Sequence, residues 1–167
     1  MRKRNEQGFT LIELLIVVAI IGIIAAIAVP GLLRARISGN EASAIGSMRA
    51  INTAQQNYSQ LCNGYSPDLP TLQTAGNYLS PDLTGAAPVT KSGFTIASAG
   101  AGAVIAGVPA TCNGPQPNYY ASATALSTST GSRAFATTEA GTIFYTTTPL
   151  APPTLAAITA GTATPIQ

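Results

Sequence analysis

Residues 8–33 begin Gly8-Phe9-Thr10-Leu11-Ile12-Glu13 and continue as LLIVVAIIGIIAAIAVPGLL. No charged side chain occurs between Leu14 and Leu33, and 13 of these 20 residues are Leu, Ile or Val. As an α-helix this stretch would be about 30 Å long, which is the thickness of the hydrocarbon core of a bilayer. The stretch therefore predicts a helix that spans a membrane.

Basic residues before the apolar stretch predict its orientation. Arg2, Lys3 and Arg4 precede it, and the positive-inside rule keeps such a terminus in the cytoplasm. The remainder of the chain would then be translocated. One alternative is an ordinary secretory signal peptide cut after Ala28, and another is a plain membrane anchor without processing. Against the first, Glu13 lies inside what would be the apolar region of the signal.

The run from Gly8 to Leu14 after a short basic leader resembles the class III signal of type IV pilins and type II secretion pseudopilins. This resemblance implies that a membrane prepilin peptidase removes the leader, residues 1–8, by cutting between Gly8 and Phe9. The same enzyme would then N-methylate Phe9. Residues 9–33 would be retained, first as a transmembrane anchor and later as the core of a filament.

Glu13 is the one carboxylate near the apolar stretch, and such a charge is costly unless it is paired. Cleavage creates an amine at Phe9. In a pilin-like assembly, Glu13 of one subunit could pair with the Phe9 amine of a neighbour and thereby fix the register of the helices. The alternative is that Glu13 only lies at the membrane interface.

Gly22 and Pro30 interrupt the apolar helix. Proline removes a helical hydrogen bond, and glycine lowers helix propensity by about 1 kcal/mol relative to alanine. The segment between them is thus the weakest part of the helix, and the resemblance implies that it could unwind locally during assembly. An ordinary proline kink is the alternative.

Residues 34–61 predict an amphipathic continuation of the same helix, to a C-cap at Asn63-Gly64. Apolar side chains recur there at helical spacing, while Arg34, Arg36, Glu41, Asn52 and Gln56 are expected mostly on other faces. The predicted stripe consists of Ile37, Ala44, Met48, Ile51, Tyr58 and Leu61.

Residues 62–148 predict an exposed domain with a small antiparallel sheet packed on the second half of the helix. A loop-rich region is expected from Gly64 to about Ser92, followed by strands at 94–97, 119–124, 132–138 and 142–147. Gly141 suits the left-handed position of a hairpin loop. The fold class is α+β, a pilin-like roll, and residues 149–167 are expected to form a flexible tail.

Cys62 and Cys112 are the only cysteines. An oxidising compartment would favour a disulfide between them. Two buried free thiols are the alternative.

Composition argues against most enzymes. The chain has 167 residues, of which 8% are charged, and it contains no histidine. It thus offers no imidazole for base catalysis or metal binding, and its six carboxylates are scattered. From Phe9 onward five basic and five acidic residues cancel, so no electrostatic footprint for nucleic acid remains. We expect no catalytic, cofactor or metal site.

The leading hypothesis is a structural subunit of a type IV pilus-like filament, with a role in adhesion, motility or a related surface function. Its expected partners are copies of itself, the prepilin peptidase, an inner-membrane assembly platform and, before assembly, the lipid bilayer. The subunit would begin as a single-pass inner-membrane protein and end in an extracellular or periplasmic filament. One alternative is a major pseudopilin of a type II secretion system, and a less favoured one is a secreted binding module cleaved after Ala28. Some major pseudopilins bind calcium through acidic residues in a C-terminal loop, where this chain has only Glu139 after Asp82.

Overall fold

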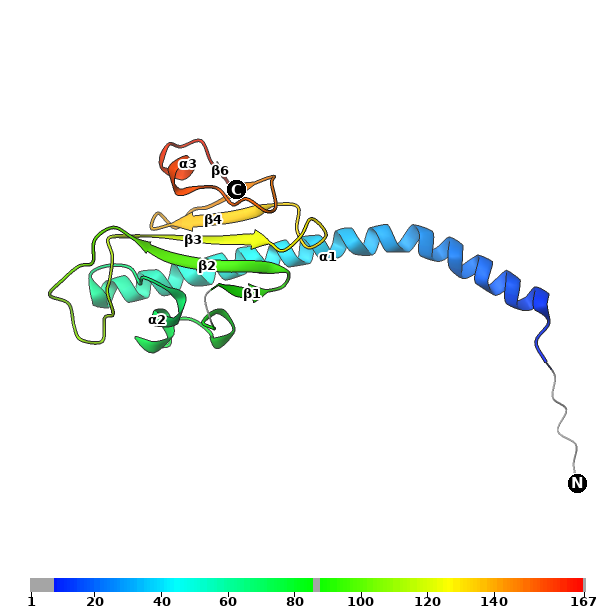
Figure 1. Cartoon of the computed structure of the whole chain (residues 1–167), viewed down its shortest axis with the longest axis horizontal. Helices are drawn as coiled ribbons and strands as arrows, with labels where there is room; N and C mark the ends of the chain where they lie inside the picture. Colours follow the sequence, from blue (N-terminus) through cyan, green and yellow to red (C-terminus); the bar gives the residue numbers. More distant parts are fainter. Residues whose placement is uncertain (1–7, 86–87, 167) are drawn as a thin grey trace, which may run out of the picture. The chain divides into compact units, whose positions relative to one another are not determined.

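A long N-terminal helix, α1 (Leu11–Cys62), dominates the chain (Figure 1). The computed structural model describes residues 8–85 and 88–166 and divides into two compact units, the first ending at Arg36 and the second beginning at Ile37. The helix begins two residues later and ends one residue later than the expected 9–61. It stops where Asn63 adopts a left-handed conformation, with φ of 53°, which is a common way to end a helix. Residues 1–7 of the expected leader lie outside the described residues.

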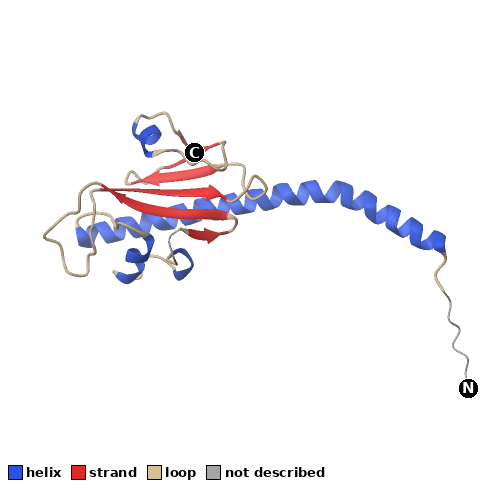
Figure 2. Cartoon of the chain, viewed as in Figure 1, coloured by secondary structure: helices blue, strands red, loops and turns tan. Residues whose placement is uncertain are grey.

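The second unit contains a six-stranded sheet in which each strand pairs antiparallel with the next along the chain (Figure 2). This meander confirms the expected α+β class. Its strands are β1 (Val89–Lys91), β2 (Phe94–Ala101), β3 (Asn118–Ala125), β4 (Ala134–Thr138), β5 (Ile143–Thr146) and β6 (Thr164–Pro165).

The four predicted strands correspond to β2, β3, β4 and β5, although β2 is four residues longer than expected. The hairpin between β4 and β5 turns at Gly141, which has φ of 73° and donates its backbone N–H to the Thr138 carbonyl at 2.9 Å. A residue with a Cβ would be strained in that conformation. The sequence pattern did not reveal β1 or β6, which are only three and two residues long.

The core lies between the sheet and the part of α1 that belongs to the second unit. Ala44, Met48, Ile51 and Tyr58 of the predicted stripe are buried there. One member of that stripe was misplaced: Leu61 is 47% exposed, and Cys62 takes its place in the core.

The region expected to be rich in loops also contains two short helical elements. Helix α2 (Leu69–Thr74) is capped by the Asp68 carboxylate, which accepts a hydrogen bond from the Thr71 backbone N–H at 2.8 Å. A 3-10 helix, η1 (Pro81–Leu83), follows it. Both elements contribute buried leucines to the core.

The C-terminal segment differs from the flexible tail that we expected for residues 149–167. It forms a short helix, α3 (Leu155–Thr159), and then adds β6 to the edge of the sheet beside β5. The Tyr120 hydroxyl on β3 donates to the Pro153 carbonyl at 2.7 Å and fastens the start of the segment. Low charge and many prolines suggested disorder, but hydrogen bonds to distant strands order this segment.

Candidate assembly site

The predicted cleavage position lies just before α1. Residues 8–10 have no regular secondary structure, and Phe9 is 86% exposed. An extended and exposed backbone is what a peptidase needs in order to bind a peptide in its cleft, and Gly8 adds no side chain to obstruct it. The local structure is thus compatible with cleavage between Gly8 and Phe9.

Glu13 lies in the first turn of α1 and forms a capping box with Thr10. Its Oε2 accepts hydrogen bonds from the Thr10 backbone N–H at 2.9 Å and from the Thr10 hydroxyl at 2.5 Å. In return, the Glu13 backbone N–H donates to the Thr10 hydroxyl at 3.3 Å. This reciprocal arrangement satisfies helix N-terminal donors that would otherwise be unpaired. Oε1 has no hydrogen-bond partner among the described residues, so it remains able to bind a cation.

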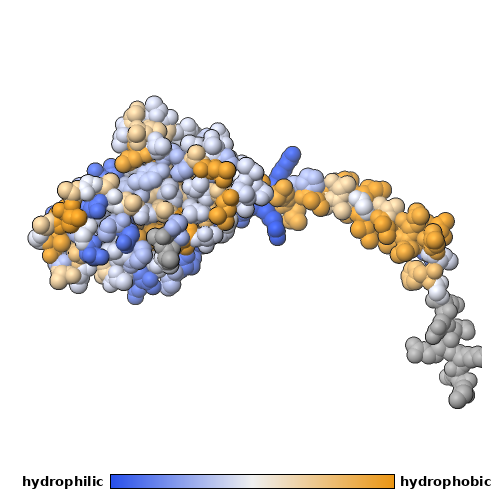
Figure 3. Space-filling model, in the orientation of Figure 1, coloured by the Kyte–Doolittle hydropathy of each residue, from blue (hydrophilic) through white to orange (hydrophobic). Residues whose placement is uncertain are grey.

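The apolar part of the first unit exposes its side chains, and the face visible in Figure 3 is largely hydrophobic. Every Leu, Ile and Val between Leu11 and Leu33 is between 46% and 80% exposed. Because these 15 side chains are only partly exposed, covering them is worth on the order of 15 kcal/mol, at about 1 kcal/mol each. This part of α1 is long and apolar enough to cross a membrane, and it needs a lipid or protein environment that the described chain does not itself supply.

Gly22 and Pro30 both lie inside α1, which continues through them without a break. A Cβ added at Gly22 would meet nothing within 4 Å. Packing within the chain therefore does not explain this glycine, and local flexibility of the helix stays a prediction.

The N-terminal segment matches a known sequence family. A family described as the prokaryotic N-terminal methylation motif matches residues 3–29. The chain carries the N-terminal segment of the type IV pilin and pseudopilin family.

Curated relatives of the chain include type IV pilins and type II secretion system core proteins. The chain is 45% identical over 62 residues to the type IV major pilin protein PilA of Myxococcus xanthus, covering 37% of this chain and 28% of that protein. It is 40% identical over 78 residues to the type IV wide pilus major component PilA4 of Thermus thermophilus, covering 47% and 60%. It is 34% identical over 65 residues to the type II secretion system core protein G of Aeromonas hydrophila, covering 39% and 46%.

These similarities cover less than two thirds of each relative. No solved structure matches the chain significantly. The similarity therefore covers only part of the chain and of each relative, and the role of the whole chain has to be argued from its own residues.

Cys62 and Cys112 form a disulfide that joins the end of α1 to the loop before β3. The bridge spans a sequence separation of 50 residues. Among the described residues there is no cluster of three or more His, Cys, Asp or Glu side chains that could hold a metal ion.

Sequence reasoning missed a buried carboxylate at the start of the second unit. Glu41 was expected on a polar face, but it is only 4% exposed. Its Oε1 accepts hydrogen bonds from the Ser132 backbone N–H, the Ser132 hydroxyl and the Arg133 backbone N–H, at 2.8, 2.7 and 3.1 Å. Its Oε2 accepts two more from the Arg133 guanidinium, at 2.9 and 2.7 Å. Glu41 thus fastens α1 to the connection between β3 and β4.

The surroundings of Glu41 also lower the pKa of its carboxyl group. Burial by itself would raise the pKa of Glu41, but the hydrogen bonds from Ser132 and Arg133 and the positive charge of Arg133 outweigh burial. The pKa of this carboxyl is therefore held below its ordinary value of 4.5. The guanidinium of Arg133 also lies over the rings of Phe135 and Tyr145, at 5.6 and 5.4 Å from their centroids.

Asn52 is a second polar residue that was misplaced, because it is buried rather than exposed. Its side-chain amide donates to the Gly141 carbonyl at 2.8 Å. Its oxygen accepts from the Tyr119 hydroxyl at 2.8 Å and from the Thr137 hydroxyl at 3.0 Å. One amide thereby ties α1 to β3, β4 and the Gly141 hairpin.

Helical spacing contained the signal for two of the buried polar residues of α1, Glu41 and Gln55. The positions 41, 44, 48, 51, 55, 58 and 62 form one face with spacings of three and four, and all of them are buried. Glu41 and Gln55 lie on this face, so their burial follows from periodicity once polar residues are allowed in the stripe. Gln55 is satisfied there by two hydrogen bonds with the backbone of Ser66.

Proposed function

We propose that this chain is a structural subunit of a type IV pilus-like filament, assembled from the inner membrane. The observation that carries the proposal is the exposed apolar part of α1, which precedes a second unit with its own buried core. A bilayer would cover this part before assembly, and the same part of neighbouring copies would cover it in a filament. The pilin-type segment at residues 3–29 supports this interpretation.

Processing would prepare the subunit for assembly. A prepilin peptidase would remove residues 1–8 and N-methylate Phe9, which places a positive charge four residues before Glu13. In the assembled filament, Oε1 of Glu13 would accept a hydrogen bond from the Phe9 amine of a neighbouring copy. Because a misregistered copy would leave both charges unpaired, the pair would favour one register over others.

The remaining segments would each have a separate structural role. Residues 9–33 would form the membrane anchor and filament core, and residues 34–61 would connect this core to the exposed α+β domain at 62–148. Gly22 and Pro30 would allow the helix to adjust between the bilayer and the filament. The role is structural, and we assign it no catalytic step.

Mass spectrometry of the mature protein tests the processing step. The expected N-terminus is an N-methylated Phe9, and the protein should be recovered in filaments sheared from cells. An N-terminus at Val29 would instead indicate ordinary secretion and would contradict the proposal.

The second candidate is a major pseudopilin of a type II secretion system. The similarity to core protein G of Aeromonas hydrophila favours it, as does the loop-rich region directly after α1. Deleting the gene separates the two candidates. Loss of surface filaments with normal protein export supports the pilus, whereas loss of exported enzymes supports the secretion system.

A further inference from the structure

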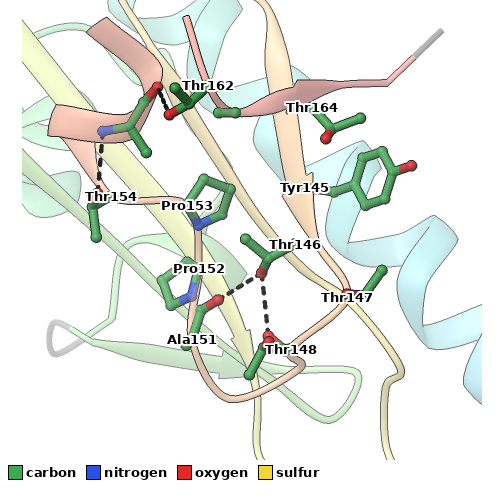
Figure 4. Close-up of a pocket in the computed structure, with 12 residues that line it drawn as sticks. Tyr145, Thr146, Thr147, Thr148, Ala151, Pro152, Pro153, Thr154, Thr162 and Thr164 are labelled. Carbon is green, nitrogen blue, oxygen red and sulfur yellow. Dashed lines mark hydrogen bonds between the residues drawn. The ribbon is translucent and has the colours of Figure 1, made fainter. Parts of the chain in front are cut away.

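A hollow of about 500 Å³ opens beside the C-terminal segment (Figure 4). Its walls are the end of β5, the connection that follows, helix α3 and the start of β6. The volume lies within the range of about 300–1,000 Å³ that is typical of small-molecule sites. Of the 12 residues that line the hollow, six are threonine and two are proline.

Hydrogen bonds hold the walls in place without a ligand. The Thr146 hydroxyl donates to the Ala151 carbonyl at 2.6 Å, and the Tyr120 hydroxyl holds the Pro153 carbonyl at 2.7 Å. On the opposite wall, Thr164 of β6 pairs with Tyr145 of β5. A ligand that enters a preformed site does not have to order these segments, which lowers the entropic cost of binding.

The threonine hydroxyls of the walls present both hydrogen-bond acceptors and donors. The hydroxyls of Thr146 and Thr162 donate hydrogen bonds to the carbonyls of Ala151 and Ala157. Toward the hollow, their oxygens can therefore act only as acceptors. The Thr154 oxygen accepts a hydrogen bond from the Ala157 backbone N–H at 3.2 Å. Its hydroxyl proton therefore remains available to donate.

No charged side chain is present among the residues that line the hollow. An ionic ligand would lose its hydration there without gaining a partner of opposite charge, which is costly. The alanine and proline carbons of the walls would instead contact the C–H groups of a ligand. We propose that the hollow binds a neutral saccharide, because a sugar ring combines C–H faces with hydroxyl groups that both donate and accept hydrogen bonds.

Saturation-transfer NMR on the full chain tests the proposal. The protein is held in lauryldimethylamine oxide, whose headgroup contains no sugar, and the probes are the methyl glycosides of glucose, galactose, mannose and N-acetylglucosamine. We expect at least one probe to receive saturation, with a dissociation constant on the order of 1 mM for a ligand of this size.

Two alanines of α3 provide a matched pair of variants. Ala157 lines the hollow, whereas its neighbour Ala156 is exposed and does not line it. Ala157→Phe should fill the hollow and weaken binding of the responding probe by tenfold or more, and Ala156→Phe should leave the binding unchanged.

A second pair does not depend on whether the phenylalanine variants fold. Thr164 of β6 and Thr90 of β1 are both exposed threonines on edge strands, but only Thr164 lines the hollow. Thr164→Val should weaken binding by about 2- to 10-fold, the effect of one lost hydrogen bond, and Thr90→Val should not.

Three results would overturn the proposal. The first is that no neutral glycoside receives saturation. The second is that Ala157→Phe, when folded, and Thr164→Val both keep the affinity of the unchanged chain, which would place the binding elsewhere. The third is that a Ser/Thr-rich peptide or glucuronic acid binds while the neutral glycosides do not.

Discussion

The carboxylate of Glu41 accepts five hydrogen bonds from two consecutive residues, Ser132 and Arg133. Sequence periodicity alone could place Glu41 on the buried face of α1. It could not identify the partners, which lie more than 90 residues later in the chain. Asn52 and its partner Gly141 show the same limit. Predicting such long-range polar pairs requires knowledge of the register of the sheet, which the sequence pattern does not specify.

Neutralising Glu41 should destabilise the second unit. Glu41→Gln keeps the size of the side chain but replaces one hydrogen-bond acceptor with a donor and leaves the partly buried Arg133 without its counter-charge. We expect a loss of about 2–3 kcal/mol in the free energy of unfolding, measured by chemical denaturation. The control is Asp82→Asn, because Asp82 pairs with Lys91 on the surface, and that loss should be below about 1 kcal/mol. Equal effects of the two substitutions would contradict the assigned role of Glu41.

The lowered pKa of Glu41 also predicts a dependence of stability on pH. A carboxyl with a lower pKa in the folded chain than in the unfolded chain binds its proton more readily when unfolded. Its contribution to stability is complete above the ordinary value of 4.5 and is lost as the pH falls through the lower pKa of the folded protein. Unfolding followed between pH 6 and 2 should therefore show a smaller loss of stability in Glu41→Gln than in the unchanged chain. Parallel pH profiles would show that other groups cause the loss.

Glu13 has two roles in our proposal, and two substitutions separate them. Thr10→Ala removes the Thr10 hydroxyl that bonds to Glu13 but keeps the Glu13 carboxylate. We therefore expect filaments to form. Glu13→Ala removes the partner of the neighbouring Phe9 amine and leaves a buried charge uncompensated, at a cost of about 3–5 kcal/mol. Processed monomer should then accumulate in the membrane, as measured by comparing sheared filaments with the membrane fraction. A normal filament yield from processed Glu13→Ala would show that the carboxylate is dispensable.

At the scale of elements, α1 and strands β2 to β5 were predictable, and the other short elements were not. Helix α1 was placed within two residues at each end, and the Gly141 hairpin was identified from its turn residues. The short strands β4 and β5 were found because they flank this hairpin. In contrast, α2, α3, β1 and β6 have six residues or fewer, too few to establish a hydrophobic period by themselves. These elements are fixed by capping residues and by contacts with the sheet, which explains why the segment after residue 149 was mistaken for a flexible tail.

The disulfide between Cys62 and Cys112 predicts a redox-dependent stability. Closing a loop with a sequence separation of 50 residues stabilises the folded chain by up to about 4 kcal/mol through the entropy of the unfolded state. A reducing agent should therefore lower the midpoint of thermal unfolding. The double variant Cys62→Ala, Cys112→Ala serves as control, since its midpoint should not respond to reductant. Free thiols found by labelling the unreduced chain would show that the bridge does not form.

At the scale of the whole molecule, the two units need different surroundings. The second unit buries its own apolar core, whereas the large apolar residues of the first unit are exposed. A chain that begins at Ile37 should therefore stay monomeric without detergent, and the full chain should require detergent. Sedimentation velocity in buffer alone measures the difference. Association of the shortened chain would place a self-association surface in the second unit.

The strictly sequential order of the sheet has a consequence for biogenesis. If the part of the chain after the membrane anchor is translocated in sequence order, each new strand finds its partner in the strand delivered immediately before it. The thiols of α1 and of the loop before β3 are both delivered before β3 itself, so an oxidase could link them while the last four strands are still in transit. Folding can then proceed vectorially, and the edge strand β6 is the last of the six to be added.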